Sequence, residues 1–307
     1  MEKVEKYRKL CKYVQNFGMV AIALVCFLFI FIFGFKTNNG NVITYVMGAM
    51  LLLFMFLIFT SVPMQNKLVK MVILESLNGL VSDVTFNKKK GYSRESFEKL
   101  NIVNCSFSNY SCSDYYNFKY KNMEIESTTV RAYDEIKVNK VKKNGKQSKR
   151  TTKQIKNYFF GRIYLIPLES EIKFNVYGKK NPTYSRKKEM ANTNYSIECP
   201  LKVKKYAENF EVFSNENQKI DDLQLFIDKL YYLKTQAKGP VFAFVRNKTL
   251  VLCIDNNHYY KEIEFKDPID KGLINDYRKD VSMVLSFINS LLKDKESRRY
   301  NGLWTKK

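Results

Sequence analysis

The chain is poor in the residues from which most catalytic and metal sites are built. It has one histidine, His258, among 307 residues, which excludes a histidine-rich zinc site. Its six cysteines include no Cys-x-x-Cys pair, so the spacing of a structural zinc site or redox pair is missing. The Ser-x-x-Lys, Gly-x-Ser-x-Gly, P-loop and dinucleotide-binding patterns are also absent, and no stretch has the acid spacing of a calcium loop. The common enzyme signatures are therefore lacking.

Few polar residues remain as candidates for a reaction centre. His258 as a general base would need an orienting carboxylate, and Asp255 and Glu262 are near it only along the sequence. Two carboxylate pairs stand at expected helix starts, where capping accounts for them: Asp221-Asp222 and Asp267/Asp270. We therefore assign no catalytic, cofactor-binding or metal-binding residue and expect no cofactor. The sequence favours a protein that is not an enzyme.

Acidic residues are in a clear minority. Asp and Glu total 30 against 52 Lys and Arg, which leaves a formal net charge of +22. Such an excess attracts anionic partners, either a membrane surface or a nucleic acid. The high content of Lys, Asn, Tyr, Phe and Ile is also what an AT-rich genome produces, so a compositional origin of the charge stays open.

Two long uncharged runs occupy residues 17–35 and 42–62. They hold 19 and 21 residues, and at about 1.5 Å per residue each helix would be close to the thickness of a bilayer's hydrocarbon core. Neither run has the polar stripe of a soluble helix. The first run is longer than the apolar region of a signal peptide and ends in FIFGFK. The pattern predicts a transmembrane helical hairpin.

The distribution of basic residues predicts the orientation of this hairpin. Residues 36–41, KTNNGN, are a short turn with one lysine, whereas Lys67 and Lys70 follow the second run. The segment before the first run is more basic, with Lys3, Lys6, Arg8, Lys9 and Lys12. The positive-inside rule then places both termini in the cytoplasm, which makes the chain a multi-pass protein of the cell (plasma) membrane. In that reducing compartment the cysteines should be free thiols.

The expected organisation has five parts. They are a basic cytosolic N-terminus (1–16), the transmembrane hairpin (17–62), an amphipathic stalk (63–100), a cytosolic α+β domain (101–293) and a flexible charged tail (294–307).

Within the cytosolic domain, alternating patterns predict strands over 101–178 and 209–214. A helix with Asp221 as its N-cap should follow and break at Gly239-Pro240. Three short strands over 241–265, with a turn at Asn256-Asn257, should precede a final helix over 271–293. We expect antiparallel sheets with an amphipathic stalk helix and two packing helices.

The most basic stretch reads KVNKVKKNGKQSKRTTK, residues 137–153, and Asn144-Gly145 at its centre favours a type I′ hairpin turn. Seven basic residues around this turn have no acid among them: Lys137, Lys140, Lys142, Lys143, Lys146, Lys149 and Arg150. Two interpretations stay open, a solvated hairpin tip and a contact with the anionic inner leaflet.

Four segments carry a resemblance to a known family. They are FFGRIYLIP (159–167), NFEVFS (209–214), DDLQLFIDKLYYL (221–233) and DVSMVLSFINSLL (280–292). Their order resembles an uncharacterised group of bacterial membrane proteins with a domain of unknown function, sometimes mislabelled "galanin". The similarity covers roughly 70–293, but the helix that opens here with Asp221-Asp222 usually opens with Thr-Pro or Ser-Pro. The resemblance implies two membrane spans and a cytosolic α+β domain, and no activity.

The leading hypothesis is a membrane-anchored, non-enzymatic binding or scaffold protein whose basic domain engages anionic lipid headgroups or a protein partner. One alternative is an enzyme at the membrane surface, with a site assembled from scattered Asp, Glu, Tyr and Lys. Nucleic-acid binding ranks third, because the sequence shows no RRM-type aromatic signature and no helix-turn-helix spacing.

Overall fold

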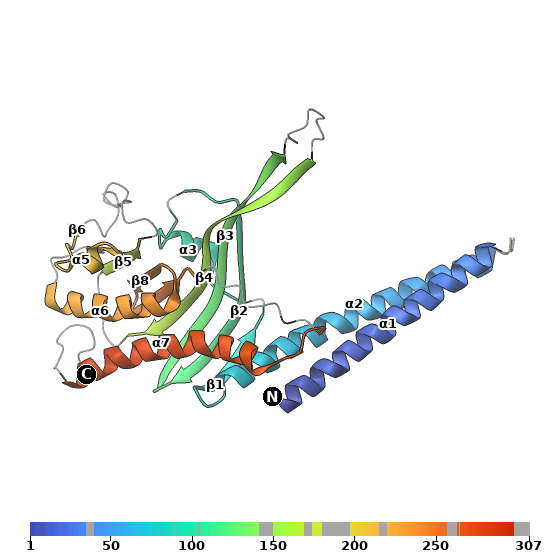
Figure 1. Ribbon diagram of the computed structural model, residues 1–307, viewed down its shortest axis with the longest axis horizontal. Coiled ribbons are helices and arrows are strands. Elements are labelled where there is room, and N and C mark those ends of the chain that lie inside the picture. The colour runs from blue at the N-terminus through green and yellow to red at the C-terminus, as the bar shows by residue number, and fades with distance from the viewer. Residues whose placement is uncertain are drawn as a thin grey trace. The chain divides into compact units, whose positions relative to one another are not determined.

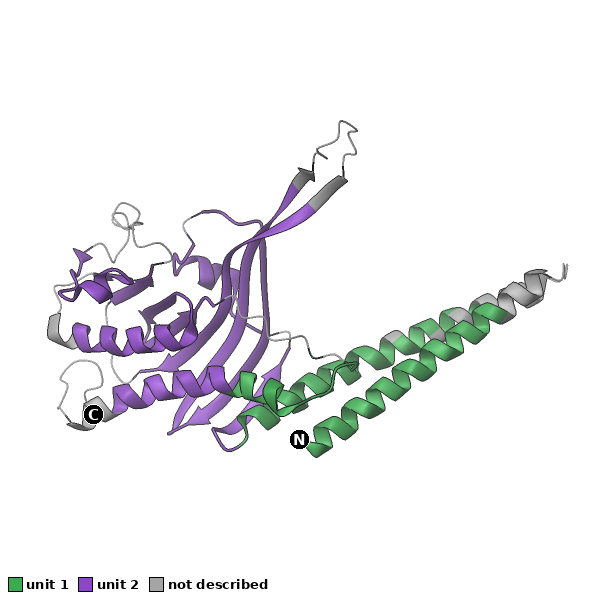
Figure 2. Cartoon of the chain, in the orientation of Figure 1, with its two compact units in different colours: residues 1–78, 260–278 green, residues 79–259, 279–307 purple. Residues whose placement is uncertain are grey.

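The computed structural model describes residues 1–34, 40–88, 90–103, 105–140, 150–168, 174–179, 197–214, 220–256, 263 and 265–297. The chain divides into two compact units (Figure 2). Unit 1 comprises residues 1–78 and 260–278, and unit 2 comprises residues 79–259 and 279–307.

Unit 1 is built on two long helices, α1 (Glu2–Gly34) and α2 (Gly40–Leu77). Their outer surfaces expose large apolar side chains such as Phe27, Leu52 and Phe59. Both are long and apolar enough to cross a membrane, judged by length and composition, within Glu2–Phe27 and Phe54–Leu77. The predicted bilayer crossings, 17–35 and 42–62, fall inside these helices except for Phe35, which lies outside the described residues, and the crossing stays a prediction.

The helices of unit 1 continue beyond the predicted spans. The basic segment 1–16 is the beginning of α1, and α2 passes through Pro63 into the predicted stalk and ends at Leu77. The rest of the predicted stalk is not a continuous helix, because residues 82–87 form a strand and residues 94–98 a short helix. The stalk was expected over 63–100, and the helix that enters it ends at Leu77.

A returning segment of the chain is bound to the start of α1. The side chain of Arg8 is buried, its Nε and Nη2 contact Glu5 at 2.8 and 2.6 Å, and its Nη1 donates to the carbonyl of Phe265. Glu5 in turn accepts a 3.2 Å hydrogen bond from the backbone N–H of Ile269. Gln65 on α2 donates to the carbonyl of Ile263. These bonds fix Ile263, Phe265 and Ile269 against the two helices.

Unit 2 contains one nine-stranded antiparallel sheet with the order β1-β2-β3-β4-β9-β8-β5-β7-β6. The strands are β1 (Ser82–Asn87), β2 (Asn109–Tyr120), β3 (Met123–Lys140), β4 (Arg150–Pro167), β5 (Phe174–Gly178), β6 (Ile197–Glu198), β7 (Phe210–Ser214), β8 (Val241–Arg246) and β9 (Thr249–Ile254). The α+β class with a large antiparallel sheet is confirmed.

Helices cover one face of this sheet. On β5, Phe174 packs its ring against Phe226 of α6 (Ile220–Ala237) at 5.1 Å between centroids. Phe226 also meets Phe287 of α7 (Lys271–Ser297) at 5.9 Å, and Tyr120 donates a 2.8 Å hydrogen bond to Asn289 on α7. The unit 2 part of α7, residues 279–297, therefore packs beside α6 on this face (Figure 1).

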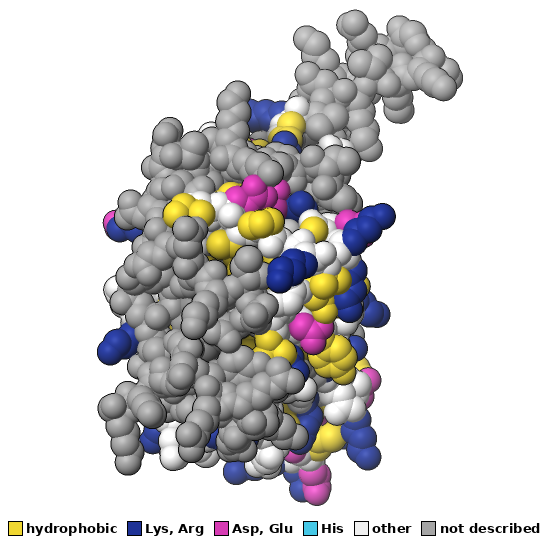
Figure 3. All heavy atoms as spheres, turned by 90° about the vertical axis from the view of Figure 1, so that its left-hand side faces the viewer, with side chains coloured by type: hydrophobic (Ala, Val, Ile, Leu, Met, Phe, Trp, Pro, Cys, Tyr) yellow, Lys and Arg dark blue, Asp and Glu magenta, His cyan; other side chains and the backbone are white. Residues whose placement is uncertain are grey.

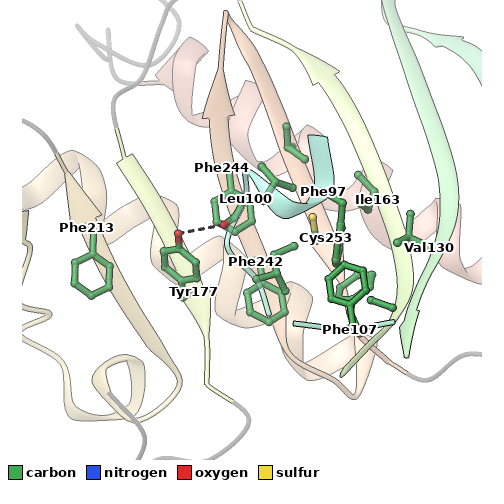
Figure 4. Packing of buried hydrophobic residues seen from close by; sticks show 14 residues of the cluster. Phe97, Leu100, Phe107, Val130, Ile163, Tyr177, Phe213, Phe242, Phe244 and Cys253 are labelled. Carbon is green, nitrogen blue, oxygen red and sulfur yellow. Dashed lines mark hydrogen bonds between the residues drawn. The ribbon is translucent and has the colours of Figure 1, made fainter. Parts of the chain in front are cut away.

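The other face is covered by the short helix α3 (Arg94–Glu98) and the residues after it. Side chains alternate along a strand, so Tyr177 points away from Phe174 and donates a 3.3 Å hydrogen bond to the carbonyl of Leu100. Phe97 and Phe107 pack here on the buried strand residues drawn in Figure 4. A further short helix, α5 (Lys204–Ala207), precedes β7.

Several local expectations differ from the structure. Helix α6 begins at Ile220, so Asp221 lies in its first turn and is not the N-cap. Of the predicted third meander strand (258–265), Ile263 and Phe265 are not in a strand, and 258–262 with residue 264 lie outside the described residues, as does Asn257 of the predicted turn. Helix α7 runs to Ser297, into the segment expected to be a loose tail.

Two tight hairpin turns lack the glycine that makes such turns recognisable. They are Lys121-Asn122, with φ of 47° and 63°, and Asn247-Lys248, with φ of 47° and 59°. Two positive φ values in a two-residue loop are typical of a type I′ turn. The Lys121-Asn122 turn was missed, because asparagine beside lysine is a weak turn signal, whereas Asn247-Lys248 falls between two of the predicted meander strands.

Candidate functional site: the basic arm of β3 and β4

The ends of β3 and β4 form a two-stranded ribbon beyond the body of the sheet. The register of β2 on β3 ends at Tyr133, and the register of β9 on β4 ends at Arg162. Past Tyr133 the two strands continue through seven paired positions, from Asp134↔Lys156 to Lys140↔Arg150. Figure 1 shows this ribbon projecting from the sheet. We call residues 134–140 and 150–156 the basic arm.

The root of the basic arm is fixed by a carboxylate. Oδ1 of Asp134 accepts a 2.6 Å hydrogen bond from the backbone N–H of Ser108, and Oδ2 accepts a 2.7 Å hydrogen bond from the hydroxyl of Tyr158. These bonds, that of Ser108 first, lower the pKa of Asp134. The same contact raises the pKa of Tyr158 to about 12. The root is thus an ionised carboxylate that holds two donors.

A second contact orients the strands next to this root. The guanidinium of Arg131 on β3 lies over the rings of Tyr133 and Phe160, at 4.6 and 5.1 Å from their centroids. Its Nε donates a 2.9 Å hydrogen bond to Asn157 on β4. The arm therefore leaves the sheet in a defined direction.

Like charges face each other across the arm. Lys137 stands directly opposite Lys153, and Lys140 directly opposite Arg150. Residues directly opposite on antiparallel strands share a face, and like charges in these positions are destabilising. Glu135 forms a 3.0 Å ion pair with Lys153, with both side chains well exposed, so it offsets little of this repulsion. The positive charges of the arm therefore do not stabilise the ribbon.

Only some of the predicted basic residues are among those that the structure describes. Lys137 is exposed on the arm, and Lys140 and Arg150 form its last described pair. The other predicted positions, Lys142, Lys143, Lys146 and Lys149, lie outside the described residues together with the Asn144-Gly145 turn. The register adds Lys153 and Lys156, which sequence reasoning missed although the chain contains no acid between Glu135 and Glu169.

Several basic side chains elsewhere in the described part of unit 2 are paired with acids. Lys119 pairs with Asp83 at 2.9 Å, and two exposed pairs on and beside α3 join Arg94 to Glu98 and Lys99 to Glu95. On the face shown in Figure 3, the coloured basic side chains are spread among hydrophobic and acidic ones. The concentration of positive charge on the arm is therefore a local feature.

The described residues do not assemble the proposed reaction centre. Asp255 is buried, and its Oδ1 accepts a 3.1 Å hydrogen bond from the backbone N–H of Phe160, which is a structural role. His258 and Glu262 lie outside the described residues. Asp270 accepts a 2.8 Å hydrogen bond from the N–H of Leu273, as expected of a carboxylate at a helix start.

No group of three or more His, Cys, Asp or Glu side chains in the described ranges could hold a metal ion. The cysteines are free thiols: Cys11, Cys26, Cys105, Cys112, Cys199 and Cys253. The arm is therefore the feature of the described chain from which a function is best argued.

Comparison of the chain with family models, curated proteins and solved structures finds no match.

Proposed function

We propose that the protein is a membrane-anchored binding protein without catalytic activity, and that its basic arm contacts anionic lipid headgroups. Helices α1 and α2 would form the anchor, with both chain termini in the cytoplasm of a cell whose plasma membrane holds them. The resemblance to the two-span bacterial family agrees with this arrangement.

The observation that carries the proposal is the cross-strand pairing of like charges. Lys137 directly opposite Lys153 weakens an isolated ribbon, and the same register brings Lys140 opposite Arg150. A local arrangement that opposes stability is expected at a functional site. An anionic surface removes the repulsion, because each basic residue close to such a surface contributes on the order of 1 kcal/mol of binding free energy.

Protection of the arm from trypsin tests the proposal. The full chain is placed in nanodiscs of phosphatidylcholine, with or without phosphatidylglycerol, and cleavage after residues 137–156 is followed by mass spectrometry. We expect cleavage there to be several-fold slower in the anionic nanodiscs, with the difference shrinking as salt shortens the Debye length from about 10 Å toward 3 Å. Equal cleavage rates in the two lipids would overturn the proposal.

A pair of charge variants separates the arm from the net charge of the chain. Lys137→Gln with Lys153→Gln removes two positive charges from one face of the arm. Lys202→Gln with Lys204→Gln removes two from exposed positions of unit 2 outside it. The arm variant should lose most of the protection at the remaining arm sites, and the control should keep it.

A further inference from the structure

The basic arm also exposes aliphatic side chains. Ile136 on β3 is 43% exposed and Ile155 on β4 is 51% exposed. The other large hydrophobic side chains exposed in the described part of unit 2 are Ile197, Val203 and Tyr232, all outside the arm. A partner of this ribbon therefore meets exposed apolar side chains as well as positive charge.

The register places the two isoleucines on opposite faces. Ile136 stands opposite Gln154, and Ile155 stands opposite Glu135, in adjacent pairs. Each isoleucine therefore faces a polar residue across the ribbon and gains no apolar cross-strand partner. Basic residues flank both: Lys156 shares the face of Ile136, and Lys137 and Lys153 share the face of Ile155.

This pattern restricts the kind of partner. A flat partner surface would cover one face of the ribbon and leave the other isoleucine in water. A nucleic-acid groove would surround both faces, but an apolar wedge is buried there only by unstacking a base step. The headgroup layer of a bilayer surrounds an inserted ribbon on both faces and accepts apolar side chains at the acyl boundary.

The basic side chains suit the same environment. A lysine can lay its apolar stem along the acyl boundary while its ammonium group reaches the lipid phosphates. Lys137, Lys153 and Lys156, which flank the isoleucines, are exposed and so can take that conformation.

We propose that the arm enters the headgroup layer of an anionic bilayer and buries Ile136 and Ile155 at the acyl boundary. This inference rests on the proposed function, in which the arm contacts anionic lipid, and adds that the contact is an insertion. The arm would then act as a second, reversible membrane attachment besides the helices of unit 1.

Tryptophan fluorescence tests the insertion. The single tryptophan, Trp304, is replaced by phenylalanine, and Ile155→Trp then reports on the arm. Tyr232→Trp in the same background is the control, because Tyr232 is exposed on α6, away from the arm. Both full-length variants are placed in nanodiscs with and without phosphatidylglycerol, and brominated lipid serves as a quencher.

We expect the emission of the Ile155→Trp variant to shift to shorter wavelength and to be quenched by brominated lipid only in the anionic nanodiscs. The Tyr232→Trp control should not change. A shift of equal size in the control would overturn the inference, as would the same shift in neutral nanodiscs on adding a DNA oligonucleotide.

The two proposals fail in different ways. Trypsin protection in anionic nanodiscs without any emission shift would leave the lipid contact standing and overturn the insertion. Loss of both effects would overturn both.

A second variant avoids the bulky reporter. Ile136→Ser with Ile155→Ser keeps the charge of the arm, and we expect it to lower the trypsin protection factor about tenfold. An unchanged protection factor would overturn the insertion.

Discussion

The hydroxyl of Tyr158 on β4 donates a 2.7 Å hydrogen bond to Oδ2 of Asp134 on β3, at the root of the basic arm. The other carboxylate oxygen is bonded to the N–H of Ser108, in the segment that precedes β2. Three segments therefore meet at one ionised group. This junction orients the arm before any partner binds, which lowers the entropic cost of binding.

The junction should depend on pH in a defined direction. The pKa of Asp134 lies below its ordinary value of 3.8, with the Ser108 N–H as the first cause. A lowered folded pKa means that the stabilisation is complete above about 3.8 and is lost as the pH falls through the folded pKa. In NMR spectra of ¹⁵N-serine-labelled protein, the Ser108 amide should titrate with a midpoint below 3.8. The Asp134→Asn variant should abolish this titration, and a midpoint above 3.8 would contradict the assignment.

Arg162 should be important for the stability of unit 2. The residue is 4% exposed, and its guanidinium donates to Ser127 and Thr129 at 3.3 and 3.0 Å and lies 4.7 Å from the ring centroid of Tyr116. Arg162→Ala leaves a cavity and unsatisfied hydroxyl groups, so it should lower the free energy of unfolding by about 3 kcal/mol.

Chemical denaturation of the full chain in detergent measures this loss. Arg162→Met should cost less than Arg162→Ala, because methionine fills more of the space. Arg131→Met is the matched control on the neighbouring strand, where the side chain is only partly buried. A loss for Arg131→Met as large as that for Arg162→Ala would contradict this prediction.

Gly18 should control the packing of α1 on α2. A Cβ atom at this position would lie 1.9 Å from Cδ2 of Leu57, so only glycine fits without displacement. Gly18→Leu should push the helices apart and lower the unfolding temperature of the full chain in nanodiscs. Adding Leu57→Ala should restore much of the loss if the two side chains compete for one space.

Gly48 provides the matched control for that substitution. It lies on α2, and an added Cβ meets nothing within 4 Å. Gly48→Leu should leave the unfolding temperature nearly unchanged. Equal losses at both glycines would mean that helix propensity or membrane insertion, rather than the contact with Leu57, determines the result.

Arg8 should hold the returning segment of unit 1. Because its side chain donates to the carbonyl of Phe265, Arg8→Gln should free the neighbouring backbone. Trypsin should then cleave after Lys266 several times faster than in the unmodified protein. Lys9→Gln, which changes an exposed neighbour by the same charge, should leave that rate unchanged.

Local patterns predicted many elements of the fold. The strand at 210–214 and the helix that ends before Gly239-Pro240 follow from alternation and from a helix-breaking pair. The strand at 82–87 was missed because it is short: only Val84 and Phe86 alternate with exposed residues on this edge strand. The type I′ turn at Lys121-Asn122 was also missed, since these two residues take positive φ only because the paired strands require it.

The amino-acid order alone determined the two long apolar helices, the α+β class and the cluster of positive charge between Glu135 and Glu169. These properties depend on composition and short-range periodicity, which a chain carries before it folds. Tertiary structure decided that Lys137 faces Lys153, that Ile136 and Ile155 occupy opposite faces, and that Asp134 joins three segments. Strand register and long-range hydrogen bonds set these relations, because a shift of one residue moves every side chain of a strand to the other face.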